Sequence, residues 1–171
     1  YRKTRMKDKT VLFVDDEVSI LNTLKRLLRN EEYNLLTATS AQEGLELLSQ
    51  QAVDIVISDM RMPGVSGTEF LEKVKDKYPM IKRMIMSGYA DLESVVSAIN
   101  QGNISQFISK PWDNDALKQI VLNHLPNHQD TSSAPYEDAL EIDNLKKIIC
   151  EQQNKIDDLQ QQLEKLSVQK I

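Results

Sequence analysis

The sequence has a single cysteine, Cys150, and no apolar stretch long enough to cross a membrane. One cysteine excludes an intramolecular disulfide. The apolar runs, such as residues 53–57 with Asp54 in their midst, fall far short of the ~20 residues that a transmembrane helix needs. The N-terminus also lacks the pattern of a signal peptide. Together these absences favour a cytoplasmic protein.

The sequence also lacks an excess of basic residues. Its 171 residues include 21 Lys and Arg against 26 Asp and Glu, which leaves a net charge of −5. This balance argues against a surface dedicated to nucleic acid or to an anionic membrane. With 40% apolar and 27% charged residues, the composition is that of an ordinary globular protein, and the length excludes two large domains.

The distribution of charge marks a boundary near residue 126. Residues 1–125 carry 16 basic and 17 acidic residues, whereas residues 126–171 carry 5 and 9. A polar stretch that contains proline and serine joins the two parts and is typical of a linker. The five residues before Met6 are typical of a cloning remnant. The predicted regions are an N-terminal extension at 1–8, a folded domain at 9–125, a linker at 126–136 and a helical segment at 137–171.

Two periodicities alternate along residues 9–125. Short apolar runs of strand length are each followed by apolar residues at helical spacing. Ser40 with Glu43 predicts a capping box before the second helix, and Asp113 predicts a cap for the fifth. Apolar strands that alternate with helices predict a (βα)5 α/β fold, with a parallel five-stranded sheet covered on both faces. The predicted strands are residues 11–14, 33–38, 53–57, 83–86 and 106–108.

Charged and polar residues follow these runs. Asp15 and Asp16 come after the first run, Asp59 after the third, Ser87 after the fourth and Lys110 after the fifth. The carboxyl ends of parallel strands share the sheet edge where ligands bind. Carboxylates gathered there repel one another unless they hold protons or bind a cation, and such oxygen ligands suit Mg²⁺ or Mn²⁺. The alternative is that the aspartates only cap the following helices, which leaves the lysine unexplained.

Four motifs, in this order and at this spacing, resemble the receiver domain of two-component response regulators. They are VDDE at 14–17, SDMRMPG at 58–64, MSGYA at 86–90 and FISKPW at 107–112. The resemblance covers residues 9–125. It implies a flavodoxin-like, doubly wound sheet with the strand order 2-1-3-4-5.

The resemblance also implies a role for each aspartate. Asp59 would be the phosphoacceptor, a carboxylate nucleophile that takes a phosphoryl group from a histidine kinase. Asp16, Asp59 and the backbone carbonyl of Arg61 would bind Mg²⁺ or Mn²⁺ directly, and Asp15 would act largely through water. The metal would let one anion approach another. The peptide bond between Lys110 and Pro111 would be cis.

Further roles follow from the same resemblance. Lys110 and Ser87 would bind the phosphoryl group through an ammonium and a hydroxyl group. Ser87 and Phe107 would form the switch pair, with Phe107 swinging inward when Ser87 moves toward the phosphoryl oxygens. For Phe107 the alternative is a plain core aromatic residue. Arg61 and Tyr89 occupy positions that tune dephosphorylation in the family.

From residue 142 onward, apolar residues recur at alternating intervals of three and four. Seven of eight core positions over four heptads are apolar, which predicts a coiled coil, and Ile at a with Leu at d favours a parallel dimer. Gln152 would lower stability and help to fix the register. The alternative is a helix that folds back on its own domain, although such helices show a wider apolar face. The core positions are Ile142, Ile149, Ile156 and Leu163 at a, and Leu145, Gln152, Leu159 and Leu166 at d.

These expectations combine into a phosphorylation-controlled receiver joined to a dimerising coiled coil. It would be a phosphoacceptor domain, not an enzyme, and would relay the state of Asp59 to an output domain or partner that this chain lacks. Its partners would be a sensor histidine kinase and a second copy of the chain, with no direct binding of nucleic acid or membrane by this segment. Two alternatives stay open: a Mg²⁺-dependent phosphohydrolase with Asp59 as nucleophile, and a constitutive coiled-coil scaffold.

Overall fold

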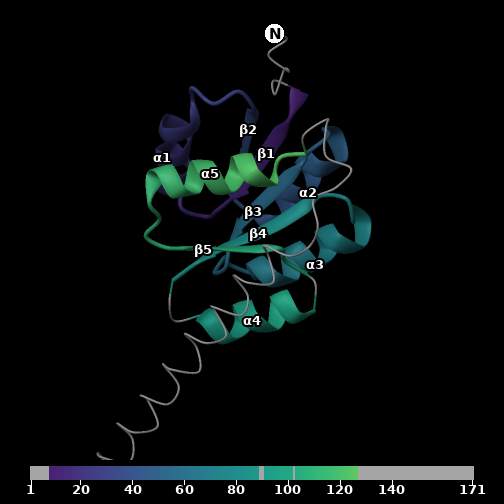
Figure 1. The fold of residues 1–171 in the computed structure, drawn as a ribbon. Helices are drawn as coiled ribbons and strands as arrows, with labels where there is room; N and C mark the ends of the chain where they lie inside the picture. Colours follow the sequence, from purple (N-terminus) through teal and green to yellow (C-terminus); the bar gives the residue numbers. More distant parts are fainter. Residues whose placement is uncertain (1–7, 89–90, 102, 127–171) are drawn as a thin grey trace, which may run out of the picture. The chain divides into compact units, whose positions relative to one another are not determined.

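The computed structural model describes residues 8–88, 91–101 and 103–126. Strands and helices alternate along this part of the chain, as the two periodicities predict (Figure 1). The strands are β1 (Thr10–Val14), β2 (Asn34–Ala38), β3 (Ile55–Asp59), β4 (Lys82–Ser87) and β5 (Gln106–Ser109). The helices are α1 (Val18–Leu28), α2 (Ala41–Gln50), α3 (Gly67–Lys77), α4 (Leu92–Asn100) and α5 (Asn114–His124).

All five strands run parallel in one sheet with the order β2-β1-β3-β4-β5. This is the order that the resemblance implied. The carboxyl ends of these strands lie side by side in the sheet, because Val14 of β1 pairs with Ser58 of β3 and Ser87 of β4 pairs with Ser109 of β5. The residues that follow these positions therefore meet at one edge of the sheet.

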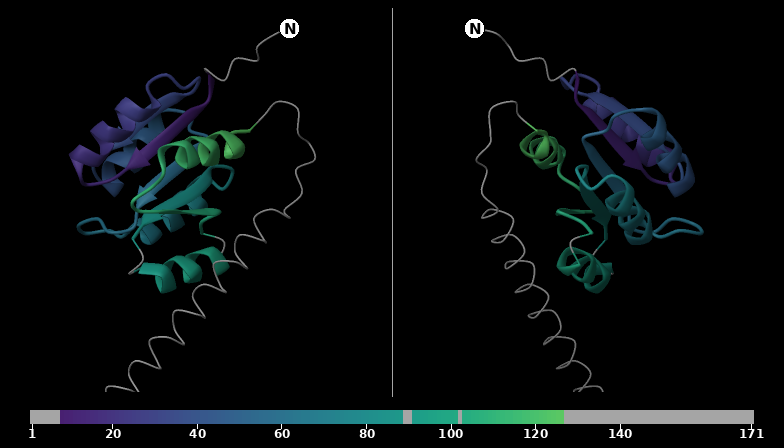
Figure 2. Two further views of the ribbon diagram at one scale, coloured as in Figure 1. Left: turned by 60° about the vertical axis from the view of Figure 1, so that its left-hand side comes forward. Right: turned by 90° about the vertical axis from the view of Figure 1, so that its right-hand side faces the viewer.

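Helices cover both faces of the sheet (Figure 2). Successive side chains of a strand point to opposite faces, so Val11 and Phe13 pack under α1 and α5, whereas Leu12 and Val14 pack under α2, α3 and α4. All four side chains are fully buried. Burial on both faces explains why the central strands are continuous apolar runs instead of alternating ones.

The helix caps agree with the sequence in part. The Ser40 hydroxyl accepts from the backbone N–H of Glu43 at 3.2 Å, as predicted, but the Glu43 carboxylate bonds the residue before Ser40 and leaves the box incomplete. A complete capping box lies at the start of α3, between Ser66 and Glu69. Asp113 caps α5 as predicted, because it accepts from backbone N–H groups of the first turn.

Some of the sequence-based expectations concern residues outside the described ranges. These are the N-terminal extension through residue 7, Tyr89, the linker beyond Pro126 and the coiled coil at 137–171, and for them the expectations stay predictions. Within the described ranges, none of the helices combines the length and the apolar character needed to cross a membrane.

Candidate functional site

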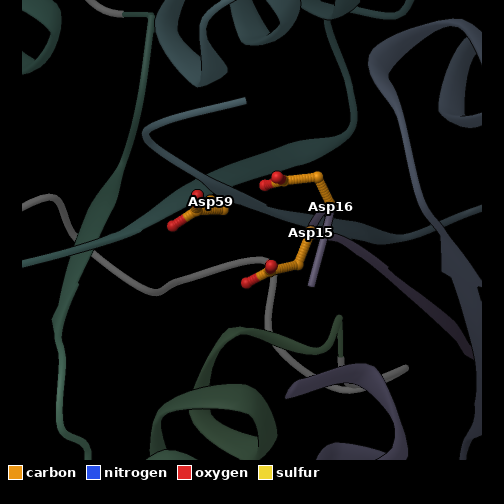
Figure 3. A group of neighbouring side chains, drawn as sticks. All are labelled: Asp15, Asp16 and Asp59. Carbon is orange, nitrogen blue, oxygen red and sulfur yellow. The ribbon is translucent and has the colours of Figure 1, made fainter. Parts of the chain in front are cut away.

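An acidic cluster lies where β1 and β3 end. Asp15 and Asp16 follow β1 directly, and Asp59 is the last residue of β3. One carboxylate oxygen from each lies within 4.8 Å of the others, and the three carboxyl groups face a common space (Figure 3). Asp15 and Asp59 are buried while Asp16 is exposed. Oxygen ligands gathered in this way suit a hard divalent cation, so the cluster could hold a metal ion.

Lys110 reaches into this cluster from the end of β5. Its Nζ lies 2.9 Å from Oδ2 of Asp15 and 2.6 Å from Oδ1 of Asp59. Burial by itself lowers the pKa of Lys110, but the hydrogen bonds to Asp59 and Asp15 and their negative charges outweigh it, so the pKa is raised above its usual value. The ammonium group therefore keeps its charge. The Lys110–Pro111 peptide bond is cis, as expected.

Backbone N–H groups orient the two buried carboxylates. Oδ1 of Asp15 accepts from the N–H of Glu17 at 2.8 Å, and Oδ2 of Asp59 accepts from the N–H of Arg61 at 3.1 Å. Neither aspartate caps a helix, since Glu17 occupies the cap position of α1 and Ser66 that of α3. The capping alternative is therefore wrong for both. In each carboxylate, one oxygen accepts a hydrogen bond from a backbone N–H group and the other accepts one from Lys110.

Two glycines shape the loop between β3 and α3. Gly64 has a φ of 81°, a left-handed conformation that favours glycine. At Gly67, an added Cβ would lie 2.0 Å from the carbonyl oxygen of Asp59, so only glycine allows α3 to start this close to Asp59. The path of this loop therefore depends on glycine at both positions.

A second group of side chains lies beside the cluster, at the end of β4. Ser87 is 1% exposed, and its hydroxyl donates to Oδ2 of Asp91 at 2.9 Å and to the carbonyl of Gly88 at 3.2 Å. The Asp91 carboxylate also accepts from Arg61: Nε lies 2.9 Å and Nη2 2.6 Å from Oδ1, and Nε lies 3.1 Å from Oδ2. The hydrogen bonds from Arg61 lower the pKa of Asp91, and those with Asp91 raise the pKa of Arg61.

No sequence motif pointed to Asp91, although Ser87 and Arg61 were both candidates. Asp91 stands 30 residues from Arg61 along the chain, and its only local signal was its place before a predicted helix. That signal suggests a cap, yet the Asp91 side chain makes no capping hydrogen bond. Its contacts to Arg61 and Ser87 become visible only in the folded domain.

Phe107 lies on β5 opposite Ile85 of β4. It is partly buried and packs against the apolar cluster under α2, α3 and α4. Its main-chain neighbour Ile108 is nearly fully buried on the other face. Phe107 therefore belongs to the core in this structure but keeps an exposed portion, which is compatible with either interpretation of its role.

Comparison with known proteins extends these observations. The family model described as the response regulator receiver domain matches residues 11–122. Over 115 residues the chain is 44% identical to the hydrogenase transcriptional regulatory protein HoxA of Cupriavidus necator, which covers 67% of this chain and 24% of that protein. It is 35% identical over 125 residues to the DNA-binding transcriptional regulator NtrC of Klebsiella pneumoniae, which covers 71% of this chain and 26% of that protein.

A solved structure gives a similar result. The crystal structure of an uncharacterized protein from Neptuniibacter caesariensis superposes with a TM-score of 0.67 and 46% identity, covering 69% of this chain and 87% of that one. The chain spans about a quarter of the length of the two curated relatives, 24% of HoxA and 26% of NtrC. The similarity to these longer proteins therefore concerns one of their parts.

Proposed function

The chain belongs to the response regulator receiver family, and from this premise we propose that Asp59 accepts a phosphoryl group from a phosphohistidine of a sensor histidine kinase. The observation that carries the proposal is the shared contact of Lys110 with Asp59 and Asp15 at the edge of the sheet. This contact places a positive charge beside a buried carboxylate that has two further carboxylates close by. Such a site suits the approach of an anionic group to an anionic nucleophile.

In the proposed reaction, an oxygen of the Asp59 carboxylate attacks the phosphorus of the phosphohistidine. An O–P bond forms as the N–P bond breaks, and the imidazole nitrogen leaves with the electron pair and takes a proton from water. The backbone N–H of Arg61, now on Oδ2 of Asp59, orients the carboxylate for this attack. Lys110 stabilises the negative charge that the phosphoryl oxygens bring.

The acidic cluster is the proposed metal site. Its carboxylate oxygens lie within 4.8 Å of one another, which fits the ligand set of Mg²⁺ or Mn²⁺. Asp15, Asp16, Asp59 and the backbone carbonyl of Arg61 would hold the ion, with Asp15 acting largely through water. Bound there, the ion would supply positive charge that offsets the negative charges of the carboxylates and of the phosphoryl group.

The proposed switch involves Ser87 and Phe107. The Ser87 hydroxyl, which points to Asp91 in this structure, would turn to the phosphoryl oxygens, and Phe107 would move inward beside it. Such a rearrangement would alter the surface formed by α4, β5 and α5. Arg61, and Tyr89 outside the described residues, would tune the lifetime of the phosphorylated state.

The direct test is phosphorylation of the full chain by a small phosphodonor with Mg²⁺, followed by intact mass. Asp59→Asn is expected to abolish the mass gain, because an amide is not nucleophilic enough to take the phosphoryl group. The matched control Asp76→Asn removes an exposed carboxylate of α3 and is expected to keep the gain. A gain retained by Asp59→Asn would place the acceptor elsewhere.

Further measurements on the wild type and Asp59→Asn separate the alternatives. A Mg²⁺-dependent phosphohydrolase would release phosphate steadily from a small ester, whereas a receiver holds one phosphoryl group per chain and then loses it. In a constitutive scaffold, Asp59→Asn would change nothing, with or without the phosphodonor. The proposed function requires that Asp59→Asn changes both the mass gain and any phosphorylation-dependent behaviour.

The C-terminal heptads support a further part of the proposal, although they lie outside the described residues. We propose that residues 137–171 join two chains in a parallel coiled coil that relays the switch to an output domain or partner. HoxA and NtrC are named as transcriptional regulators, so control of transcription is the output that we propose. The cytoplasmic location predicted from composition is part of the same proposal.

Light scattering with Mg²⁺ alone, and then with Mg²⁺ and beryllofluoride as a mimic of the phosphoryl group, tests the dimer. We expect a dimer in both states, and a monomer when Ile149 and Ile156 are both replaced by Asp, because charge at a positions disrupts the seam. A persistent dimer in that variant would place the interface in the receiver instead.

A further inference from the structure

Asp91 occupies the cap position of α4 without acting as a cap. Its side chain makes no capping hydrogen bond, and its backbone, with φ −110° and ψ 11°, lies outside the extended region of the residues that cap α2, α3 and α5. Aspartate is among the residues that cap helices best. The first turn of α4 thus begins without the stabilisation that its own preceding residue is able to give.

The Asp91 carboxylate is engaged elsewhere. Oδ2 accepts from the Ser87 hydroxyl at 2.9 Å, and Oδ1 accepts from Nη2 of Arg61 at 2.6 Å. Both donors come from the edges of the phosphorylation site, since Ser87 ends β4 and the backbone N–H of Arg61 bonds Asp59. One carboxylate therefore holds two groups that a phosphoryl group on Asp59 would attract.

These contacts lead to an inference that rests on the proposed function and adds a residue to it. We propose that Asp91 is a latch that holds Ser87 and Arg61 in the unphosphorylated domain and caps α4 when phosphorylation takes Ser87 away. The phosphoryl oxygens and the Asp91 carboxylate compete for the same hydroxyl. Release then frees the Asp91 carboxylate, and with a shift of the Asp91 backbone into the extended region of a capping residue it bonds the N–H groups of Glu93 or Ser94, which lie in the first turn of α4 and have no acceptor within the helix.

Burial explains why the latch is able to open. The Arg61 side chain is 70% exposed, so water replaces the carboxylate as its partner at little cost. Ser87, in contrast, is buried at 1% exposure, and a buried hydroxyl needs a partner. The phosphoryl oxygens would supply that partner once the hydroxyl leaves Asp91.

The opposite end of α4 is held by other contacts. Lys75 donates to the carbonyl of Gln101 at 2.9 Å and to the side chain of Asn103 at 3.2 Å, and Arg83 donates to the Asn103 carbonyl at 2.9 Å. None of these groups touches the phosphorylation site in the described residues. Asp91 itself lies at the N-terminal end of α4, the end beside the site.

Binding of beryllofluoride to the full chain with Mg²⁺ measures the competition. Isothermal calorimetry, or the fluorescence of the single tryptophan Trp112, gives the Kd. Asp91→Ser removes the ion pair with Arg61 but keeps a side chain that caps helices well. Asp91→Ala removes both the ion pair and the capping side chain. Glu93→Gln, which changes an exposed carboxylate in the same turn, controls for the loss of one negative charge.

We expect Asp91→Ser to bind beryllofluoride about tenfold more tightly than the wild type. In this variant the Asp91 carboxylate no longer competes with the ligand for the Ser87 hydroxyl. Asp91→Ala is expected to tighten binding less, since it cannot cap α4, and Glu93→Gln to stay within about twofold. Wild-type affinity in Asp91→Ser, or weaker binding, would overturn the latch and leave Asp91 a structural residue.

Two further results keep the inference distinct from the proposed function. If the wild type binds beryllofluoride no better than Asp59→Asn, the proposed function is wrong and the latch with it. If the wild type binds beryllofluoride in an Asp59-dependent way, the results for the Asp91 variants alone decide whether Asp91 is a latch. Amide hydrogen exchange adds a direct readout: beryllofluoride is expected to slow exchange at Glu93 and Ser94 in the wild type but not in Asp91→Ala. Equal slowing in both proteins would contradict the proposed cap.

Discussion

Two contacts between a carboxylate and a cation lie at the same edge of the sheet, and they differ in burial. The Asp15 side chain is fully buried against Lys110, which is itself 21% exposed. The Asp91 side chain is 16% exposed, and its partner Arg61 is 70% exposed. The same chemical pairing therefore occurs once in the interior and once at the surface of one site.

The difference in burial separates the roles of the two contacts. Removing one member of a buried pair leaves a charge without compensation and is costly, so the contact of Lys110 with Asp15 and Asp59 is a fixed part of the domain. An exposed pair contributes little, because water and salt compete with it. The contact of Arg61 with Asp91 is thus exchangeable. The fixed contact of Lys110 suits the proposed phosphoacceptor chemistry, and the exchangeable contact of Arg61 with Asp91 suits the proposed switch.

The largest expected effect on stability comes from removing the contact of Lys110 with Asp15 and Asp59. In the absence of divalent metal, Lys110→Ala is expected to lower the free energy of unfolding by about 2 kcal/mol, less than for a fully buried pair because the lysine is partly exposed. Mg²⁺ is expected to recover part of the loss by neutralising the aspartates. Urea unfolding with and without Mg²⁺ measures both effects.

The matched control for this variant is Lys118→Ala. Lys118 of α5 pairs with Glu31, which is not part of the acidic cluster, at 3.3 Å, and its side chain is 31% exposed. We expect a loss below about 1 kcal/mol and no Mg²⁺-dependent recovery. If the two lysine variants lost the same stability, the contact at the sheet edge would not be the fixed element that its burial indicates.

A second way to disturb the fixed contact of Lys110 is Gly67→Ala. The added Cβ would lie 2.0 Å from the carbonyl oxygen of Asp59, so α3 and the end of β3 must separate, at an expected cost of about 1–3 kcal/mol. The rate of phosphorylation by a small phosphodonor is expected to fall as Asp59 moves. Gly88→Ala is the control for stability, because a Cβ there meets no atom within 4 Å. An unchanged phosphorylation rate in a destabilised Gly67→Ala would show that Asp59 keeps its position.

Removing the exposed ion pair of Arg61 with Asp91 is expected to change the stability far less. Arg61→Ala removes the ion pair with Asp91, and we expect only a small decrease in the midpoint of thermal unfolding. The difference from the wild type is expected to shrink at high salt, where exposed charges are screened. A large decrease that salt does not reduce would show that this pair is as fixed as the contact of Lys110.

The pH dependence of stability sharpens the comparison, because the two contacts respond at opposite ends of the pH scale. The pKa of Lys110 is raised above its usual 10.5, so its contribution is complete below that pH and is lost as pH rises through the folded-state value. The pKa of Asp91 is lowered from its usual 3.8, so its contribution is present above that pH and is lost as pH falls through the folded-state value.

Unfolding midpoints measured from acid to alkaline pH test these directions. Lys110→Ala is expected to flatten the alkaline side of the curve. Asp91→Ala is expected to flatten the acid side by a smaller amount, since the Arg61 side chain that lowers the pKa of Asp91 is largely exposed to solvent. An Asp91→Ala curve that departs from the wild type mainly at alkaline pH would contradict the assignment of the two contacts.

Much of the fold and part of the site could be predicted from the sequence. The alternation of strand-length runs and helical spacing predicted the parallel sheet, and the polar residues after each run predicted which side chains meet. The strand order came from the resemblance, because periodicity alone does not say which strands are neighbours. The boundaries shifted by one or two residues, as with β3, which was expected at 53–57 and lies at Ile55–Asp59. The incomplete capping box at Ser40 shows the same limit, since its outcome depended on where the Glu43 carboxylate found a partner.

By itself, the sequence determined the properties that depend on near neighbours along the chain: the type of each element, its buried faces and the residues at its ends. Only the tertiary structure decided which residues at those ends contact one another. Lys110 meets Asp15 across 95 residues, and Asp91 meets Arg61 instead of capping its own helix. A side chain chooses between a local partner and a distant one by distance and burial, and both are set by the packing of strands that are far apart in the sequence.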